Sequence, residues 1–338
     1  MLEALRQLPH FKHFSDAQLE QLRGCAFRHQ YPEGAVVIQE RETTREAFVV
    51  ESGEVSLQRQ TSYGSFEVTR LTPGQLFGEM NFVDGDTRSV DALTLAPCDL
   101  LVLNPVRLEQ LCAEDPAFEV AFTWTLWKSL SAKLRQTNNN LSRFFIDETA
   151  ANDAPRAMAE SVEDTKIDIE DKRAVFREQG LSNMEVNYLG SLCEARRFRP
   201  GQLVFADGDD GDRMYVVVEG RIMISKIIPG AGEEAMAFLG RGEFFGEMSL
   251  IDDLPRSADA AADAGGALLL SIRREVLSKI LDIDRASSIR LLKVMTKLLA
   301  KRLRETNEKI IGWYILSGGS HREGLPHQSS APKSSDDD

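Results

Sequence analysis

The chain repeats itself over most of its length. Gly53-Glu54 in the first half matches Gly220-Arg221 in the second half at an offset of 167 residues. Near the end of each half, Leu134-Arg135-Gln136-Thr137-Asn138 matches Leu303-Arg304-Glu305-Thr306-Asn307 at an offset of 169. The offset drifts by only two residues, and 338 residues with 42% hydrophobic side chains are enough for two cores. The sequence therefore predicts a duplicated domain.

Both copies have the same order of predicted elements. Each begins with an amphipathic helix, marked by Leu19 and Leu22 in the first copy and by Met184, Tyr188 and Leu189 in the second. Short runs rich in Val, Ile and Phe follow. The predicted strands are 36–39, 47–50, 55–59, 68–71 and 100–103, and then 203–206, 214–218, 222–226, 235–239 and 268–272. Many short strands with regular turns favour a sandwich or jelly-roll barrel. Because a long helix closes each copy, the predicted fold class is mainly β with flanking helices (α+β).

Composition divides the chain into four segments. Residues 147–171 are rich in Ala, Asp and Glu and contain Pro155, which predicts an acidic linker that can be helical in parts. From Gly318 onward the composition predicts a disordered tail. The predicted domains are residues 1–146 and 172–317, and the tail is 318–338.

One repeated motif suits a sugar phosphate. Its copies are Phe77-Gly78-Glu79-Met80 with Arg88-Ser89-Val90 and Phe245-Gly246-Glu247-Met248-Ser249 with Arg256-Ser257-Ala258. The glycine lets the backbone approach a ligand closely, and the short helical turn after it offers free amides. Glu247 can accept a hydrogen bond from a ribose hydroxyl, Ser257 adds a hydroxyl contact, and the small Ala258 permits an amide contact. The planar guanidinium of Arg256 can bind two phosphate oxygens at once.

The same residues also have a purely structural interpretation. The glycine turn could be an ordinary helix cap, and Arg256 could pair with Glu247 or Asp252 inside the domain. In the first copy Asn81 and Val90 replace smaller residues, and Asp84 and Asp86 place negative charge near the anion position. We therefore expect weaker binding in the first copy.

Both halves resemble cyclic nucleotide-binding domains, the module of the catabolite activator protein and of protein kinase A regulatory subunits. The resemblance rests on the Phe-Gly-Glu to Arg-Ser-Ala stretch, which is the phosphate-binding cassette of that family. It implies two tandem β jelly-roll domains, each closed by a long C-terminal helix. It also assigns Glu247 to the ribose and Arg256 to the phosphate.

The closing helices bear on the choice of base. Each carries a threonine within an apolar stripe, which in the second copy consists of Leu292, Met295, Leu299, Thr306 and Ile310. A hydroxyl on an apolar face needs a partner. The resemblance implies that Thr306 with Asn307, and Thr137 with Asn138, contact adenine. The resemblance also implies cAMP rather than cGMP, because members of that family that select cGMP often have threonine where this chain has Ser89 and Ser257. The alternative, that the threonines only tolerate a helix interface, stays open.

Trp313 and Tyr314 follow this stripe. They either fold over the purine as a lid or pack against the barrel, and the sequence leaves both open.

Charge and motifs exclude several other classes of function. A net charge of −13 disfavours a broad surface for nucleic acid or anionic lipid, and no apolar run reaches the roughly 18 residues of a membrane span. Without a leader sequence, the chain is expected in the cytoplasm. The four dispersed cysteines predict reduced thiols, and the five histidines avoid the predicted strands, so no metal or other cofactor is expected.

The predicted function is a non-enzymatic cAMP receptor. We expect no DNA-binding domain, no catalytic set and no pseudosubstrate segment, so the receptor would pass its ligand state to an unidentified partner protein, in a manner resembling kinase regulatory subunits. The closing helices also offer a surface for homodimer formation. The alternative is a scaffold protein in which one or both nucleotide sites are degenerate.

Overall fold

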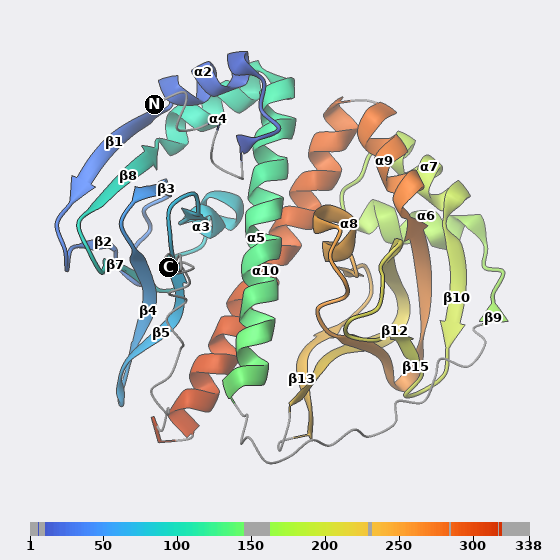
Figure 1. Cartoon of the computed structure of the whole chain (residues 1–338). Coiled ribbons are helices and arrows are strands. Elements are labelled where there is room, and N and C mark those ends of the chain that lie inside the picture. The colour runs from blue at the N-terminus through green and yellow to red at the C-terminus, as the bar shows by residue number, and fades with distance from the viewer. Residues whose placement is uncertain are drawn as a thin grey trace, which may run out of the picture.

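The computed structural model describes residue 6 and residues 11–144, 163–228, 232–283, 285–316 and 318–319. Its helices are α2 (Asp16–Gly24), α3 (Glu79–Asp84), α4 (Pro105–Glu114), α5 (Pro116–Phe144), α6 (Ile169–Glu178), α7 (Asn183–Leu192), α8 (Met248–Asp252), α9 (Arg274–Ile283) and α10 (Arg285–Leu316). Two β-rolls flank the long helices α5 and α10, which lie side by side at the centre of the molecule (Figure 1). The predicted fold class, with two antiparallel β-rolls and flanking helices, is confirmed.

The first roll consists of two four-stranded antiparallel sheets, in the orders β1-β8-β3-β6 and β2-β7-β4-β5. The strands are β1 (Ala26–Tyr31), β2 (Val36–Ile38), β3 (Ala47–Ser52), β4 (Val55–Thr61), β5 (Gly64–Leu71), β6 (Leu76–Phe77), β7 (Asp91–Thr94) and β8 (Cys98–Leu103). Phe48 and Val50 of β3 point into the roll, whereas Ala47 and Val49 pack against the helices. Since both faces of β3 are buried, its sequence lacks the polar alternation of an exposed strand.

In the second roll the same plan has longer strands. These are β9 (Glu163–Asp164), β10 (Glu194–Phe198), β11 (Leu203–Phe205), β12 (Arg213–Ile228), β13 (Gly232–Leu239), β14 (Phe244–Phe245) and β15 (Asp259–Arg273). They form one sheet in the order β13-β12-β15-β10-β9, with β11 paired to β15 and β14 to β12. The sequence predicted two strands within β12, but a bulge carries the pairing with β15 past Gly220.

Gly220 allows the bulge in β12, and Gly53 is its counterpart in the first roll. Both have a positive φ, and a Cβ on Gly220 would lie 2.1 Å from the carbonyl oxygen of Gly266. A Cβ on Gly53 would lie 2.5 Å from the carbonyl oxygen of Pro97. Proline has no amide hydrogen to continue the ladder, which is consistent with the separate strands of the first roll.

The leading helices begin at matching positions in the repeat. Ser15 caps α2 and Ser182 caps α7, each in a capping box with Gln18 or Glu185 three residues later. Part of the predicted linker is ordered, since β9 pairs with β10 and α6 begins at Ile169. The boundary drawn at residue 171 therefore lies inside α6. Residues 147–162 and most of the predicted tail fall outside the described residues.

The closing helices pair with each other inside one chain. Trp127, Leu130 and Leu134 of α5 share a core cluster with Leu292 and Met295 of α10. Both helices start at the same end of the molecule and run in the same direction (Figure 1). The stripe predicted on α10 is buried in this seam and against the rolls. The apolar faces that the sequence offered for a homodimer are therefore covered within the chain.

Burial of His13 predicts a pH-dependent stability of the first domain. Its Nε2 donates to the carbonyl oxygen of Ala121 at 3.0 Å, and burial lowers the pKa of the imidazole below its usual value. The folded state thus favours the neutral ring, so stability is complete above about pH 6.5 and falls as the pH drops through that value. We expect a lower urea midpoint at pH 5.5 than at pH 7.5. His13→Gln should remove most of this difference, while a change at the exposed His29 should preserve it. Equal wild-type midpoints would contradict this assignment.

Candidate functional site

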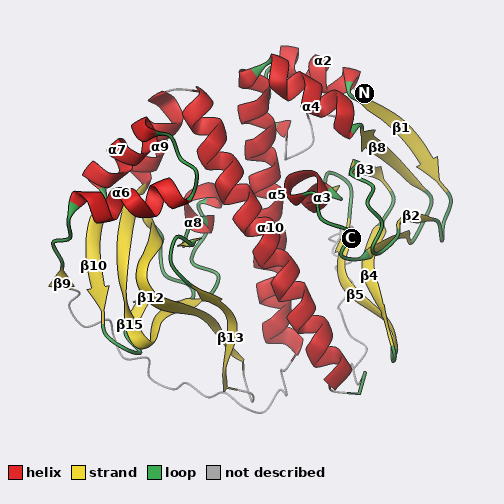
Figure 2. Ribbon diagram, turned by 180° about the vertical axis from the view of Figure 1, so that it is seen from behind, coloured by secondary structure: helices red, strands yellow, loops and turns green. Residues whose placement is uncertain are grey.

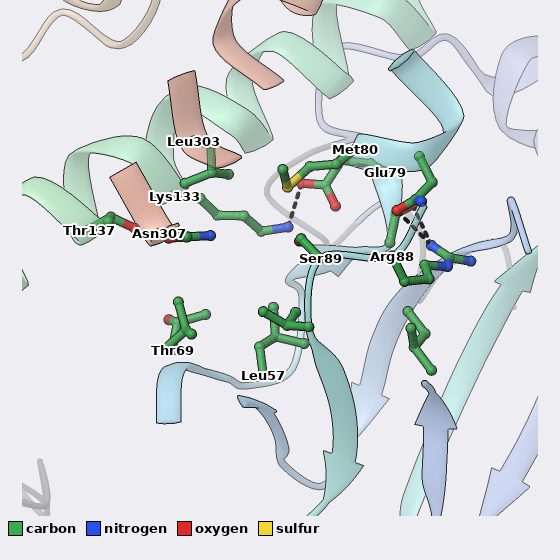
Figure 3. Close-up of a pocket in the computed structure, with 15 residues that line it drawn as sticks. Leu57, Thr69, Glu79, Met80, Arg88, Ser89, Lys133, Thr137, Leu303 and Asn307 are labelled. Carbon is green, nitrogen blue, oxygen red and sulfur yellow. Dashed lines mark hydrogen bonds and ion pairs between the residues drawn. The ribbon is translucent and has the colours of Figure 1, made fainter. Parts of the chain in front are cut away.

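Each domain holds one pocket between its roll and the paired closing helices. The first pocket is shown in Figure 3, where Arg88 and Ser89 lie opposite side chains from two different helices. Its lining residues are Ile38, Leu57, Val68, Thr69, Gly78, Glu79, Met80, Asn81, Arg88, Ser89, Val90, Lys133, Thr137, Leu303 and Asn307. The second is lined by Leu134, Asn138, Phe205, Ile224, Met236, Ala237, Phe245, Gly246, Glu247, Met248, Ser249, Arg256, Ser257, Ala258, Arg302 and Thr306. Most residues predicted for each cassette thus meet in one cavity, although Phe77 is buried inside the roll against Phe48.

A glycine in the left-handed region opens each cassette. Gly78 has φ 77° and Gly246 has φ 76°. A Cβ on either glycine would lie 2.8 to 2.9 Å from Nη1 of the arginine in the same cassette, Arg88 or Arg256. The turn therefore requires glycine both for its conformation and for the close approach of the guanidinium.

Arg256 is a buried cation without a carboxylate partner among the described residues. The residue is 5% exposed, and its Nη atoms donate to the carbonyl oxygens of Gly246 and Arg213. Its guanidinium also lies 4.2 Å from the ring centroid of Phe205. Burial lowers the pKa of Arg256, and its Nε is buried with no hydrogen-bond partner in the described part of the chain. A buried cation with a spare donor favours binding of an anion.

Arg88 is similarly buried but better satisfied by the protein. Its Nε donates to the hydroxyl of Thr44 at 3.1 Å, Nη1 to the carbonyl oxygen of Gly78 at 2.9 Å, and Nη2 to that of Glu46 at 2.7 Å. A Glu46 carboxylate oxygen lies 4.0 Å away. Burial lowers the pKa of this group as well. Fewer donors of Arg88 than of Arg256 are therefore free of protein partners in the described chain.

The two cassette glutamates are buried and paired with cations from the closing helices. Glu247 accepts a hydrogen bond from Nη1 of Arg302 at 3.0 Å, and Glu79 from Nζ of Lys133. Oε2 of Glu79 has no partner within the described ranges. Gly78 is the N-cap residue of α3 and Glu247 that of α8, and neither cap position makes a side-chain cap bond. The cassette turns thus occupy helix-cap positions, as the structural interpretation holds, while the two carboxylates bond to cations of the closing helices.

The threonines and asparagines of the closing helices belong to opposite pockets. Thr137 lines the first pocket with Asn307, and Thr306 lines the second with Asn138. Asn138 donates to the hydroxyl of Ser257 at 3.3 Å across the domain boundary. The structure therefore places Asn138 in the second pocket and Asn307 in the first, opposite to the predicted assignment. Neighbouring residues on a helix point about 100° apart, so each pair divides between the two rolls.

The sequence model of the cyclic nucleotide-binding domain family matches residues 28–115 and 195–284, which are the two rolls with their cassettes. The chain belongs to this family. Each matched segment contains one glycine turn, one cassette glutamate and one buried arginine. The paired pockets are therefore those of two cyclic nucleotide-binding domains.

Several known proteins are similar to this chain. The cyclic AMP receptor protein of Thermus thermophilus is 35% identical over 128 residues, which is 38% of this chain and 57% of that protein. The cGMP-dependent protein kinase of Eimeria tenella is 26% identical over 267 residues, 79% of this chain and 21% of the kinase. Among solved structures, the regulatory domain of Toxoplasma gondii PKA with cAMP has a TM-score of 0.32 at 17% identity, covering 86% of this chain and 92% of that one. The chain spans about half of the first relative and a fifth of the second.

The lid candidates of the cyclic nucleotide-binding domains lie elsewhere. Neither Trp313 nor Tyr314 lines a pocket, and Tyr314 packs on Phe66 of the first roll with ring centroids 4.8 Å apart. Ile310 and Ile311 belong to the same buried hydrophobic cluster as Phe66 and Tyr314. This cluster joins the first roll to Met236 and Ala258 of the second domain, so the two aromatic residues pack between the domains, and their role as a lid stays a prediction.

The first cassette accommodates the residues that the sequence marked as unfavourable. Asp84 is held by Arg304, which turns its carboxylate toward α10. Nδ2 of Asn81 donates to the backbone carbonyl oxygen of Asp86, and Oδ1 of Asn81 lies 3.5 Å from Nη1 of Arg88. Asn81 therefore takes up a donor that a ligand would otherwise use.

Several pocket residues were not predicted from the sequence. Lys133 and Arg302 occupy matching repeat positions four residues before the predicted threonines, so helical spacing placed them on the same face. Thr69 of β5 has a buried hydroxyl without a partner in the described structure, where the second pocket has Ala237. This strand position carried no signal, because nothing in a short apolar run shows which residue faces a ligand.

Other site types find no support in the described residues. There, no three His, Cys, Asp or Glu side chains gather as a metal site would require. Over the same ranges, every helix is too short or too polar to traverse a bilayer. Cys25, Cys98, Cys112 and Cys193 are all free thiols.

Proposed function

We propose that the protein is a non-enzymatic, cytosolic cAMP receptor with two nucleotide sites, which relays its ligand state to a partner protein. The observation that carries the proposal is the buried guanidinium of Arg256, with an unpartnered Nε and no carboxylate within hydrogen-bonding range in the described chain. A cyclic phosphate supplies the missing charge and acceptors. Glu247 lies one residue beyond the glycine turn, where a ribose 2'-hydroxyl would reach it.

The base contacts favour adenine. Oδ1 of Asn138 and Oδ1 of Asn307 are buried acceptors without partners in the described ranges. The hydroxyl of Thr306, which lines the second pocket, donates to the carbonyl oxygen of Arg302 at 2.8 Å, so its oxygen can act toward a ligand only as an acceptor. An adenine amino group donates to such acceptors, whereas the guanine O6 atom would face them with another acceptor. We therefore propose cAMP as the preferred ligand over cGMP.

Titration calorimetry with purified, nucleotide-free protein tests this proposal. We expect heat from two sites with cAMP at micromolar concentrations or below, the stronger site in the second domain, and weaker binding of cGMP. The absence of heat with either nucleotide would refute the receptor function. A stronger response to cGMP would overturn the assignment of the base.

The alternative function is a scaffold that has kept the fold while a site degenerated. Only the first domain offers an observation in its favour, namely that Thr44, Gly78 and Glu46 already take up the donors of Arg88. A stoichiometry of one cAMP per chain would support degeneration of that site alone.

The relay step is tested by affinity capture with and without cAMP. We expect the set of retained proteins to change with the nucleotide. The double variant Arg88→Ala/Arg256→Ala should show no such change, because it retains the surface but loses both phosphate contacts. An identical set with and without cAMP would contradict the relay.

A further inference from the structure

The cassette of the second domain is held by an arginine from the closing helix of the first. Arg135 of α5 binds both carboxylate oxygens of Asp252, with Nε 3.0 Å from Oδ2 and Nη2 3.1 Å from Oδ1. Its Nη1 donates to the carbonyl oxygen of Pro255 at 2.6 Å. This fork joins the last residue of α8 to the residue that precedes Arg256.

The first domain receives the same contact from the second. Arg304 of α10 binds Asp84, with Nε 2.7 Å from Oδ2 and Nη2 3.1 Å from Oδ1. Its Nη1 donates to the carbonyl oxygen of Thr87 at 2.9 Å, and Thr87 precedes Arg88. All three donors of Arg304 thus repeat the pattern of Arg135. We call the two sets of contacts the reciprocal forks.

The reciprocal forks are largely shielded from water. The side chains of Arg135 and Asp252 are 13% and 21% exposed, and those of Arg304 and Asp84 are 17% and 13% exposed. A bidentate pair with this shielding is stronger and better oriented than a surface ion pair. Figure 2 shows α3 and α8 on opposite sides of the paired α5 and α10, so each fork reaches outward from the seam to one cassette.

Each closing helix therefore contacts both pockets. Helix α5 meets the first through Lys133 and Thr137, and the second through Arg135 and Asn138. A further cross-domain contact accompanies each fork. Nζ of Lys226 donates to Oδ1 of Asn139 at 3.2 Å, and Arg59 pairs with Glu308 at the matching repeat positions.

On the basis of the proposed nucleotide sites, we propose that Arg135 and Arg304 are positioning residues that act across the domain boundary. Arg135 fixes the loop that carries Arg256, and Arg304 fixes the loop that carries Arg88. A phosphate bound by one cassette thus depends on the closing helix of the other domain. Because such a linkage is reciprocal, nucleotide in one site changes the affinity of the other.

Calorimetry in a single-site background tests the assignment. In Arg88→Ala protein, which retains only the second phosphate site, adding Arg135→Ala should weaken cAMP binding about tenfold, in keeping with loss of charge-assisted hydrogen bonds. In Arg256→Ala protein, Arg304→Ala should weaken the first site similarly. Lys301→Ala is the matched control, since Lys301 lies on α10 with its side chain 57% exposed and pairs with Glu243 and Glu305, which line neither pocket. It should change either affinity less than twofold.

Charge and structure are separated by further variants. Asp252→Asn in the Arg88→Ala background leaves α5 and the bond from Arg135 to Pro255 unaltered, and it should produce most of the loss caused by Arg135→Ala. Combining the two changes should add little, because both remove one interaction. Arg135→Lys should restore part of the affinity, and unchanged circular dichroism would exclude unfolding as the cause.

The outcomes distinguish this inference from the proposed function. If neither the wild-type protein nor the Arg88→Ala protein binds cAMP, the receptor function fails. If Arg88→Ala protein binds cAMP equally with and without Arg135, the receptor function stands and the cross-domain assignment is overturned.

Discussion

Replacing Arg256 with alanine should weaken cAMP binding to the second domain by about 2 to 5 kcal/mol, a loss of thirtyfold or more. The guanidinium is buried, stacks on Phe205, and has an Nε without a partner in the described chain, while the other pocket arginine, Arg302, is paired with Glu247. Calorimetry should show the stronger site disappearing while the weaker one persists. Arg256→Lys should recover little, because an ammonium cannot bind two phosphate oxygens in a fixed plane.

A matched arginine in the same roll provides the control. Arg221 is 58% exposed and pairs with Asp263 away from the pocket, so Arg221→Ala should leave both affinities unchanged. Arg88→Ala should remove the weaker site by the same reasoning. If Arg256→Ala protein retained wild-type affinity at both sites with its fold intact, the cassette would have been assigned the wrong role.

The fold was predictable from the repeat, because short runs of Val, Ile and Phe mark the strands in both copies. Predicted strands at 47–50, 55–59 and 235–239 fall within β3, β4 and β13. Strand β1 was missed because four of its six residues are exposed and its sequence, AFRHQY, shows no apolar run. What the sequence could not show was that β12 and β15 continue past their glycines, since this depends on pairing between distant strands.

The cassettes were predictable because their chemistry is local. Gly246, Glu247 and Arg256 lie within eleven residues, and a single turn brings them together. The exchange of Asn138 and Asn307 between the two pockets could not be predicted from local sequence in this way. Helical geometry alone implies that adjacent residues face different neighbours, but only the packing of α5 on α10 shows that the second neighbour is the other domain.

That packing also explains why the reciprocal forks could not be inferred from sequence. Arg135 and Asp252 are 117 residues apart, and Arg304 and Asp84 are 220 apart. The two arginines and the two aspartates occupy matching positions in the repeat. These positions indicate the forks only when the two copies are known to lie on either side of a shared helix pair. The duplicated chain thus uses one seam both to hold its domains together and to complete both pockets.

Trp127→Ala should destabilise the protein by about 3 to 5 kcal/mol, because this side chain is fully buried at the centre of the seam. Trp127 belongs to the core cluster that includes Met80, Met248 and Leu292. The cavity left by alanine would therefore remove contacts between both cassettes and the closing helices. We expect a lower midpoint in urea denaturation. Trp127→Phe should cost much less, since the indole nitrogen is buried without a partner in the described residues and its removal relieves an unsatisfied donor. A midpoint unchanged by Trp127→Ala would mean that the two domains do not depend on this seam for stability.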